Sequence, residues 1–251
     1  MGHPDKVADQ ISDTILDHCL RTDPMSRVAC ETMVTTDLAV VSGEITTKAD
    51  LSRETVDKII REMVRESGYT DPDIGFAAKS VQVHINLHAQ SPDISMGVDV
   101  GGAGDQGMMF GFACKETKTL MPLPIYLAHR LVENHAKLRE SGALKFLRPD
   151  AKSQVTVEYN GDGTPHRIHT VVISTQHDKS VIGRNGKFTD DARKVLVDKL
   201  ILPTLKAERA DLLKGELVLV MPGKPAKKSK DDQILCHINP TGNFEIGRAH
   251  V

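Results

Sequence analysis

Three side chains that can bind phosphate or transfer protons stand close together near the start of the chain. They are the imidazole of His3, the carboxylate of Asp5 and the ammonium group of Lys6, and Pro4 suits the first turn of a helix that the following residues predict. A helix N-terminus attracts anions, because its free N–H groups and its dipole carry partial positive charge. The pattern indicates either a phosphate site or an ordinary helix start in which Asp5 complements the dipole, and these residues alone favour the ordinary start.

Two acidic residues, Glu31 and Glu44, interrupt runs that are otherwise typical of strands. A carboxylate within a strand is costly unless it is exposed, paired or bound to a cation. If Thr36-Asp37 forms a two-residue hairpin turn, Glu31 pairs with Ser42, and Glu31, Ser42 and Glu44 share one face of the sheet. This geometry suits a cation or a cationic ligand, and a sheet face open to water explains it equally well.

A third charged group lies in the run Arg148-Pro-Asp-Ala-Lys-Ser-Gln-Val155, just before a predicted strand. Arg148, Asp150 and Lys152 supply a cation, an acid and a second cation within five positions. Such a group can contact the phosphates of a nucleotide, or it can be a charged turn that leads into an edge strand.

A glycine-rich stretch extends from Gln90 to Gly107. Gly102 to Gly107 has the spacing G-x-G-x-x-G, which alone is a weak indication of dinucleotide binding. That fingerprint requires a helix after it, whereas Met108 to Cys114 is an apolar, glycine-interrupted run that predicts a strand. The stretch therefore suits a mobile cover over a ligand or a plain surface turn.

The elements that must position these groups follow from hydrophobic periodicity and turn residues. The first half predicts a helix, two strands, a helix and a strand, over about residues 5–20, 27–34, 38–46, 56–67 and 81–88. The second half repeats this order over about residues 125–140, 154–159, 167–176, 189–202 and 234–238. We predict an α+β fold of pseudo-symmetric repeated domains with mixed or antiparallel sheets. The lysine-rich residues 215–233 are expected to form an exposed insertion.

Composition excludes several classes of protein. With 251 residues, 39% of them hydrophobic, the chain is long enough for a core, and disorder is excluded. Thirty-two basic residues against 34 acidic ones give no excess of positive charge for nucleic acid. No run approaches the roughly 18 apolar residues of a membrane helix. We expect a cytoplasmic protein that binds neither nucleic acid nor membrane, and the four cysteines have no zinc or disulfide spacing.

Taken together, the motifs resemble the S-adenosylmethionine synthetase (methionine adenosyltransferase) family. The matching runs begin with Gly-His-Pro-Asp-Lys-Val-Ala-Asp-Gln-Ile-Ser-Asp at 2–13, Ala-Cys-Glu-Thr at 29–32 and Gly-Glu-Ile-Thr-Thr at 43–47. They continue with Gln-Ser-Pro-Asp-Ile at 90–94, Gly-Ala-Gly-Asp-Gln-Gly at 102–107, Leu-Met-Pro-Leu-Pro-Ile at 120–125, Arg-Pro-Asp-Ala-Lys-Ser-Gln-Val at 148–155, Ser-Thr-Gln-His at 174–177 and Asn-Pro-Thr-Gly at 239–242. They cover the chain from Gly2 to Phe244 in family order.

The resemblance implies an enzyme that makes S-adenosylmethionine from ATP and L-methionine and releases phosphate and pyrophosphate. It implies Mg²⁺ and K⁺ as cofactors, and a homodimer or homotetramer whose active site is shared between subunits. The alternative is a non-catalytic nucleotide-binding relative or an inactive fragment. An ATP-dependent kinase is less favoured, because the sequence has no Gly-x-x-x-x-Gly-Lys-[Ser/Thr] loop.

The resemblance also implies roles for individual residues. His3 and Lys6 are expected to contact the triphosphate. Asp5 is expected to bind magnesium, and Glu31 is expected to bind potassium. The residues expected at the organic substrates are Glu44 and Gln90 on methionine, Asp105 by adenosine and methionine, Asp150 and Lys152 by the nucleotide, and Phe244 by the adenine. The catalytic set is His3, Lys6, Lys152 and Asp105. From the hairpin register we further expect Glu31 and Glu44 to face one pocket, with His3 and Asp5 nearby.

The resemblance divides the chain into an N-terminal domain at 1–92, a glycine-rich active-site loop at 93–107 and a central domain at 108–244. The family's segment before Gly-His-Pro-Asp-Lys and its third domain are both expected to be missing, so these residues alone are expected to be inactive. Two departures are Asn243, where the family usually has Arg, and the short loop at Asp99. Residues 245–251 are interpreted as a non-native tail, because sequencing-adapter sequence can also encode Ile246 to Val251.

Overall fold

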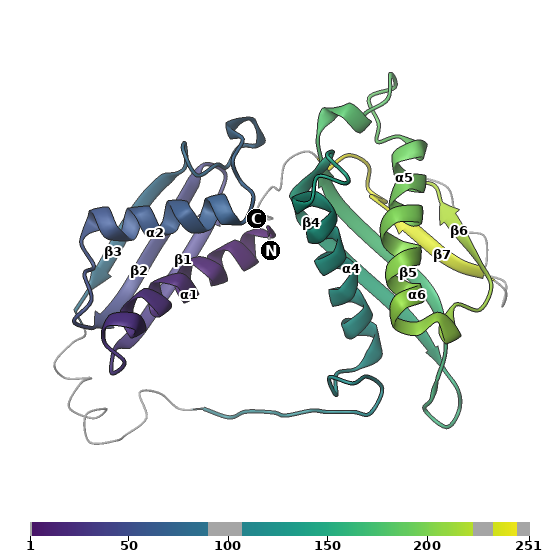
Figure 1. The fold of residues 1–251 in the computed structure, drawn as a ribbon, viewed down its shortest axis with the longest axis horizontal. Coiled ribbons are helices and arrows are strands. Elements are labelled where there is room, and N and C mark those ends of the chain that lie inside the picture. The colour runs from purple at the N-terminus through teal and green to yellow at the C-terminus, as the bar shows by residue number, and fades with distance from the viewer. Residues whose placement is uncertain (1, 90–106, 223–232, 245–251) are drawn as a thin grey trace. The chain divides into compact units, whose positions relative to one another are not determined.

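The computed structural model describes residues 2–89, 107–222 and 233–244. The chain forms two compact units, one made of residues up to Gly111 and the other beginning at Phe112 (Figure 1). Among the described residues, no helix is both long enough and apolar enough to cross a membrane.

The first unit has the element order that the sequence predicts. Helix α1 (Pro4–Thr22) is followed by strands β1 (Arg27–Thr35) and β2 (Leu38–Thr46), helix α2 (Arg53–Glu66), a short 3-10 turn (Pro72–Ile74) and strand β3 (Gln82–His88). The sheet order is β1-β2-β3, with β1 antiparallel and β3 parallel to the central β2. The predicted two-residue turn and the pairing of Glu31 with Ser42 are confirmed.

The core of this unit lies between the two helices and one face of the sheet. Helix α1 contributes Val7, Ile11, Ile15 and Cys19, which recur every four residues and are almost fully buried. Residues of alternating position in β2, such as Val41, complete the contact from the sheet side. Both helices lie on the same face (Figure 1), so no helix among the described residues of this unit covers the other face of the sheet.

The second unit repeats this plan with one strand added. Its elements are α4 (Leu123–Glu140), β4 (Leu147–Tyr159), β5 (Pro165–His177), a 3-10 turn (Lys179–Val181), α5 (Asp190–Leu196), a π-helical turn (Val197–Ile201), α6 (Leu202–Arg209), a 3-10 turn (Ala210–Leu212), β6 (Glu216–Val220) and β7 (Gln233–Ile238). The sheet order is β4-β5-β7-β6. As in the first unit, the strand after the first helix pairs antiparallel with the next strand, which in turn pairs parallel with a later one. The α+β class, the repeat and the mixed sheets are confirmed.

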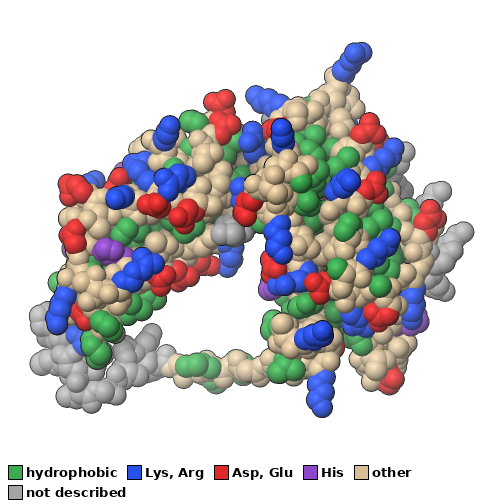
Figure 2. All heavy atoms as spheres, viewed as in Figure 1, with side chains coloured by type: hydrophobic (Ala, Val, Ile, Leu, Met, Phe, Trp, Pro, Cys, Tyr) green, Lys and Arg blue, Asp and Glu red, His purple; other side chains and the backbone are tan. Residues whose placement is uncertain are grey.

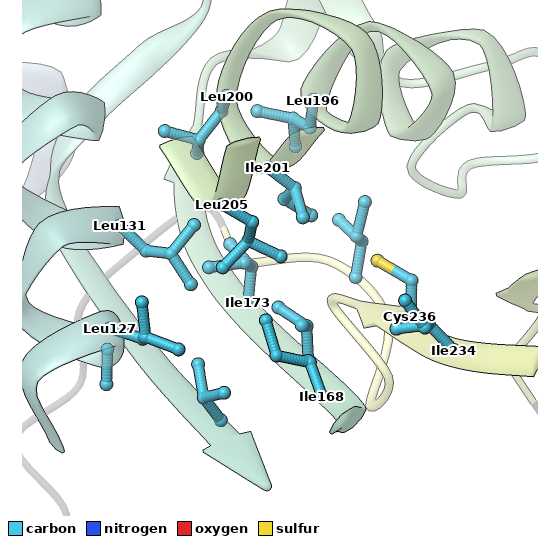
Figure 3. Packing of buried hydrophobic residues seen from close by; sticks show 14 of the residues in the cluster. Leu127, Leu131, Ile168, Ile173, Leu196, Leu200, Ile201, Leu205, Ile234 and Cys236 are labelled. Atoms are coloured by element: carbon cyan, nitrogen blue, oxygen red, sulfur yellow. The ribbon is translucent and has the colours of Figure 1, made fainter. Parts of the chain in front are cut away.

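Large aliphatic side chains from α4, α5, α6 and β5 pack together in the core of the second unit. Leu131, Ile173, Leu200 and Leu205 point toward one another in Figure 3 and are at most 1% exposed. This core fixes the sheet whose first strand carries Asp150 and Lys152.

Besides the start of β4, which lies at Leu147 instead of residue 154, three predictions about elements are wrong. Glu216–Val220 lies within the expected exposed insertion but forms β6, which pairs parallel with β7 at the edge of the sheet. Residues 217–220 are apolar and typical of a strand, but the lysine-rich residues that follow give the range 215–233 as a whole the composition of a loop. Residues 223–232 of that insertion lie outside the described residues.

The second wrong element is the strand expected from Met108 to Cys114, which is irregular and largely exposed. Hydrophobic side chains lie along this extended segment in Figure 2. An apolar run cannot form a strand without a neighbouring strand to pair with, and the described part of the chain provides none here.

The third is the helix that begins at Thr189, which continues to Arg209 instead of ending at residue 202. Pro203 has no N–H to donate to the preceding turn, and the π-helical turn just before it absorbs the irregularity without ending the helix.

Candidate functional site

The motif at residues 2–6 forms the capped start of α1. His3 is the N-cap residue, and its Nδ1 accepts a hydrogen bond from the backbone N–H of Asp5 at 3.2 Å. This contact leaves Nε2 to carry the proton of a neutral ring. The buried hydroxyl of Tyr69 donates to the carbonyl of Gly2 and holds the segment in place. The structure therefore confirms the helix start that the ordinary interpretation requires, and the Asp5 side chain stays 81% exposed.

Lys6 is engaged with a neighbour on the same helix. Its Nζ lies 2.7 Å from Oδ2 of Asp9, and both side chains are largely exposed. The hydrogen bond and the charge of Asp9 raise the pKa of Lys6, so the ammonium form is kept. An exposed pair of this kind is weak. Lys6 can therefore exchange Asp9 for a phosphate at little cost.

Glu31 and Glu44 share one face of the first sheet, as the register predicts. Glu31 lies opposite Ser42, which is two residues from Glu44 on β2. On β3, Asn86 lies beside Ser42 and His88 lies beside Glu44. We call these five residues the open sheet surface. It carries two carboxylates next to an imidazole and an amide, and Glu31 is exposed.

The expectation that His3 and Asp5 lie beside the two glutamates is wrong within this unit. Helix α1 packs on the other face of the sheet, where Ser12 hydrogen-bonds to Thr32 at 2.8 Å. Neighbouring residues of a strand point to opposite faces, so Glu31 points away from α1. The spacing in the sequence could not reveal on which face the helix would pack.

In the second unit, Asp150 and Lys152 lie within the edge strand β4. The prediction that they precede a strand is wrong, because β4 already begins at Leu147. Lys152 pairs with Ser174 of β5. Asp150 is only 1% exposed, so its carboxyl group is removed from water.

Phe244 meets Lys152 although the two are far apart in sequence. The ammonium nitrogen of Lys152 lies 5.6 Å from the centre of the Phe244 ring, within the range of a cation–π interaction. An aromatic face, a cation and a buried carboxyl group are thereby collected at one end of the second sheet. This combination suits a nucleobase with an attached phosphate chain.

Asn243, the departure from the family pattern, acts within the fold. Its Oδ1 accepts from the N–H of Phe188, and its Nδ2 donates to the carbonyl of Gly186, both at 2.8 Å. The side chain thus ties residue 243 to the loop before α5. Gln90 and Asp105 lie outside the described residues, and their roles stay predictions.

No role was predicted for Thr175, Gln176 and His177, which contact the segments that carry Asp150 and Phe244. They belong to the run Ser-Thr-Gln-His at 174–177. A signal was present, because four consecutive polar residues, 174–177, follow the apolar run from Val171 to Ile173 at the end of the strand.

His135 on α4 belongs to the same polar region. Its Nε2 lies 2.6 Å from the hydroxyl of Thr175, and the side chain is 2% exposed. Burial, followed by the charge of Arg139, lowers the pKa of His135 to about 4.

Acidification is expected to destabilise the second unit through His135. The unfolded chain protonates this residue near pH 6.5, whereas the folded chain resists protonation down to about pH 4. The stability is therefore complete above about pH 6.5 and falls by about 3 kcal/mol as the pH drops to about 4. Urea unfolding at several pH values, followed by circular dichroism, measures this loss.

His135→Gln should remove this part of the pH dependence. His166→Gln, which changes an exposed histidine of the same unit, should retain it. Equal pH profiles for the wild type and His135→Gln would contradict the assignment.

Two protein-family models match the chain. The family model described as S-adenosylmethionine synthetase, N-terminal domain, matches residues 1–92, and the one described as S-adenosylmethionine synthetase, central domain, matches residues 100–244. The chain belongs to the S-adenosylmethionine synthetase family. The resemblance found in the sequence is confirmed, and the two matches fall on the two repeats of the fold.

Curated members of the S-adenosylmethionine synthetase family are similar over almost the whole chain. The S-adenosylmethionine synthase of Salinibacter ruber is 50% identical over 254 residues, which cover 99% of this chain and 58% of the relative. Those of Nitratiruptor sp. and Bacteroides thetaiotaomicron are 46% and 44% identical and cover 98% and 99% of the chain. The chain spans a little under three fifths of the length of these relatives.

Proposed function

We propose that the protein makes S-adenosylmethionine from ATP and L-methionine, with release of phosphate and pyrophosphate. Its family membership supports the reaction class. The observation that carries the proposal is the meeting of Lys152, Phe244 and Asp150 at one end of the second sheet. There the Phe244 ring would contact the adenine, and Asp150 and Lys152 would lie by the rest of the nucleotide.

The chemistry requires stabilisation of charge more than transfer of a proton. The sulfur of methionine attacks the 5′ carbon of ATP with a lone pair, and because a thioether has no proton to lose, no general base is needed. The bond from this carbon to the triphosphate breaks, and negative charge develops on the departing oxygen. Water then hydrolyses the released triphosphate to phosphate and pyrophosphate. Lys152 is placed to stabilise that charge, which lowers the barrier only if the contact strengthens in the transition state.

The start of α1 would bind the triphosphate. His3 can donate from Nε2 and Lys6 can leave Asp9, so each can contact a phosphate oxygen. Asp5 fits a magnesium ligand, because its exposed carboxylate can join waters and substrate phosphates in an octahedral shell. Bound there, magnesium would neutralise phosphate charge.

The open sheet surface would serve methionine and potassium. Glu44 is assigned to the ammonium group of methionine together with Gln90, and Glu31 is assigned to potassium, whose oxygen preference an exposed carboxylate satisfies. Asp105 would lie by adenosine and methionine.

We also propose that the active site is shared between subunits of a homodimer or homotetramer in the cytoplasm. Within one unit, Asp5 and Glu31 belong to layers on opposite faces of the sheet. In an oligomer, the start of α1 in one copy can lie against the open sheet surface of another copy. This would bring groups like Asp5 and Glu31 together, which supports a shared site.

An assay with the chain itself and with a chimera tests this function. In the chimera, residue 244 is followed by the remainder of the Salinibacter ruber relative. We expect the chimera to form S-adenosylmethionine from ATP and methionine with Mg²⁺ and K⁺, while residues 1–244 alone are expected to form none. A folded chimera that binds ATP and forms no product would support the non-catalytic nucleotide-binding alternative.

A further inference from the structure

Three consecutive polar side chains are buried at the carboxyl end of β5. Thr175, Gln176 and His177 are 0%, 0% and 1% exposed. A buried polar group is costly unless it is hydrogen-bonded, so each of these side chains must have partners in the fold. We call them the Thr175–His177 run. The hydroxyl of Thr175 lies 2.6 Å from Nε2 of His135, whereas the backbone of Thr175 and the side chains of Gln176 and His177 bond to the segments that carry the nucleotide residues.

Gln176 holds the backbone of Asp150. The pairing of β4 with β5 shifts in register between Leu147 and Ala151, so Asp150 lies at an irregularity of the ladder. There the side-chain Oε1 of Gln176 accepts the N–H of Asp150 at 3.3 Å. The side chain thereby replaces the carbonyl that a regular strand would offer.

Thr175 holds the turn that leads to Phe244. Its N–H donates to Oδ1 of Asn239 at 2.8 Å, and its carbonyl accepts from Nδ2 of Asn239 at 3.1 Å. Asn239 has a positive φ of 45° and begins the turn Asn-Pro-Thr-Gly. This paired contact fixes the direction in which the chain leaves β7.

His177 holds the backbone of Phe244 on both sides. The N–H of His177 donates to the carbonyl of Phe244 at 3.0 Å, and the N–H of Phe244 donates to Nε2 of His177 at 3.1 Å. The other ring nitrogen, Nδ1, lies 2.9 Å from the carbonyl of Asp178 and must donate to it. Both contacts require a neutral ring with its proton on Nδ1. The ring also packs on Phe188, with centroids 4.6 Å apart.

We infer that the Thr175–His177 run is the positioning element of the nucleotide site, in which the ring of His177 holds Phe244 over Lys152. The inference rests on the proposed function for the identity of the ligand. The position of Phe244 itself can be measured on the protein without substrate.

Two substitutions of His177 separate its ring contacts. Asn places an amide near the position of Nδ1, whereas Gln reaches the position of Nε2 and can accept from Phe244. We expect His177→Asn to weaken ATP binding about tenfold, since one net hydrogen bond corresponds to about this factor. His177→Gln should stay within about threefold of the wild type. Calorimetric titration with ATP measures both, with His166→Gln, an exposed histidine of β5, as the matched control.

Exchange of the Phe244 amide, followed by NMR without nucleotide, reports the position directly. We expect the exchange to be slow in the wild type and in His177→Gln, and fast in His177→Asn. Equal exchange in the two variants would overturn the inference. If exchange follows the expectation and ATP affinity does not, His177 positions Phe244 but the nucleotide role fails, and the proposed function loses its main support.

The wild type provides a test that does not depend on the folding of a variant. The ¹⁵N chemical shifts of His177 should show a protonated Nδ1 and an unprotonated, hydrogen-bonded Nε2. A proton on Nε2 would exclude the bond from Phe244 and overturn the inference.

Discussion

Replacing Lys152 with alanine is expected to lower kcat of the active protein by about 10²–10³-fold, with a small change in KM for ATP. The ammonium group lies 5.6 Å from the Phe244 ring, where the triphosphate of a nucleotide on that ring is within reach of a flexible lysine. Charge on the leaving triphosphate is greatest in the transition state, so loss of the cation affects the chemical step more than binding. Steady-state kinetics with ATP and methionine provides both constants.

Two controls accompany this measurement. Lys152→Arg keeps the charge and should retain more of the activity than alanine does, although the geometry of its contacts changes. Lys145→Ala removes an exposed lysine just before β4 and should leave kcat unchanged. A raised KM for ATP with an unchanged kcat in Lys152→Ala would show that Lys152 only binds the substrate.

A second large effect is expected at Gly43, next to Glu44 in β2. Gly43 has a φ of +148°, and a Cβ atom there would lie 2.0 Å from the carbonyl oxygen of Ala29 on the adjacent strand. Strained backbone and overpacking each cost about 1–3 kcal/mol, so Gly43→Ala should lower the free energy of unfolding of the first unit by about 4 kcal/mol. The clash involves backbone, which cannot turn aside as a side chain can.

Hydrogen exchange measured by mass spectrometry on peptides of β1 and β2 checks this loss in the first unit alone. Gly161→Ala is the matched control, because no atom lies within 4 Å of the added Cβ at that position. Its exchange should match that of the wild type. Unchanged protection of β1 and β2 in Gly43→Ala would show that the strands separate without loss of stability.

Local patterns were sufficient for most elements. The spacing of Val7, Ile11 and Ile15 predicted α1, because a helix brings every fourth residue to one face. The two-residue turn at Thr36-Asp37 fixed the register of β1 and β2, so the sequence placed Glu31 and Glu44 on one face of the sheet.

Patterns failed where an element depends on a distant neighbour. Met108 to Cys114 is as apolar as a strand and has no pairing partner among the described residues, whereas Glu216–Val220 pairs with β7. A strand exists only through hydrogen bonds to another strand, and its own composition does not decide whether one is present.

The sequence by itself determined the α+β class, the repeat and the family, because periodicity, turns and long motifs are properties of short segments. Only the tertiary structure decided which of the candidate residues meet. It placed α1 and the Glu31 side chain on opposite faces of the first sheet and brought Lys152 to Phe244. It also showed why buried Gln176 and His177 are polar, since their hydrogen-bond partners lie on other segments of the chain. Contacts between distant segments depend on how helices and strands pack, and packing is a property of the whole unit.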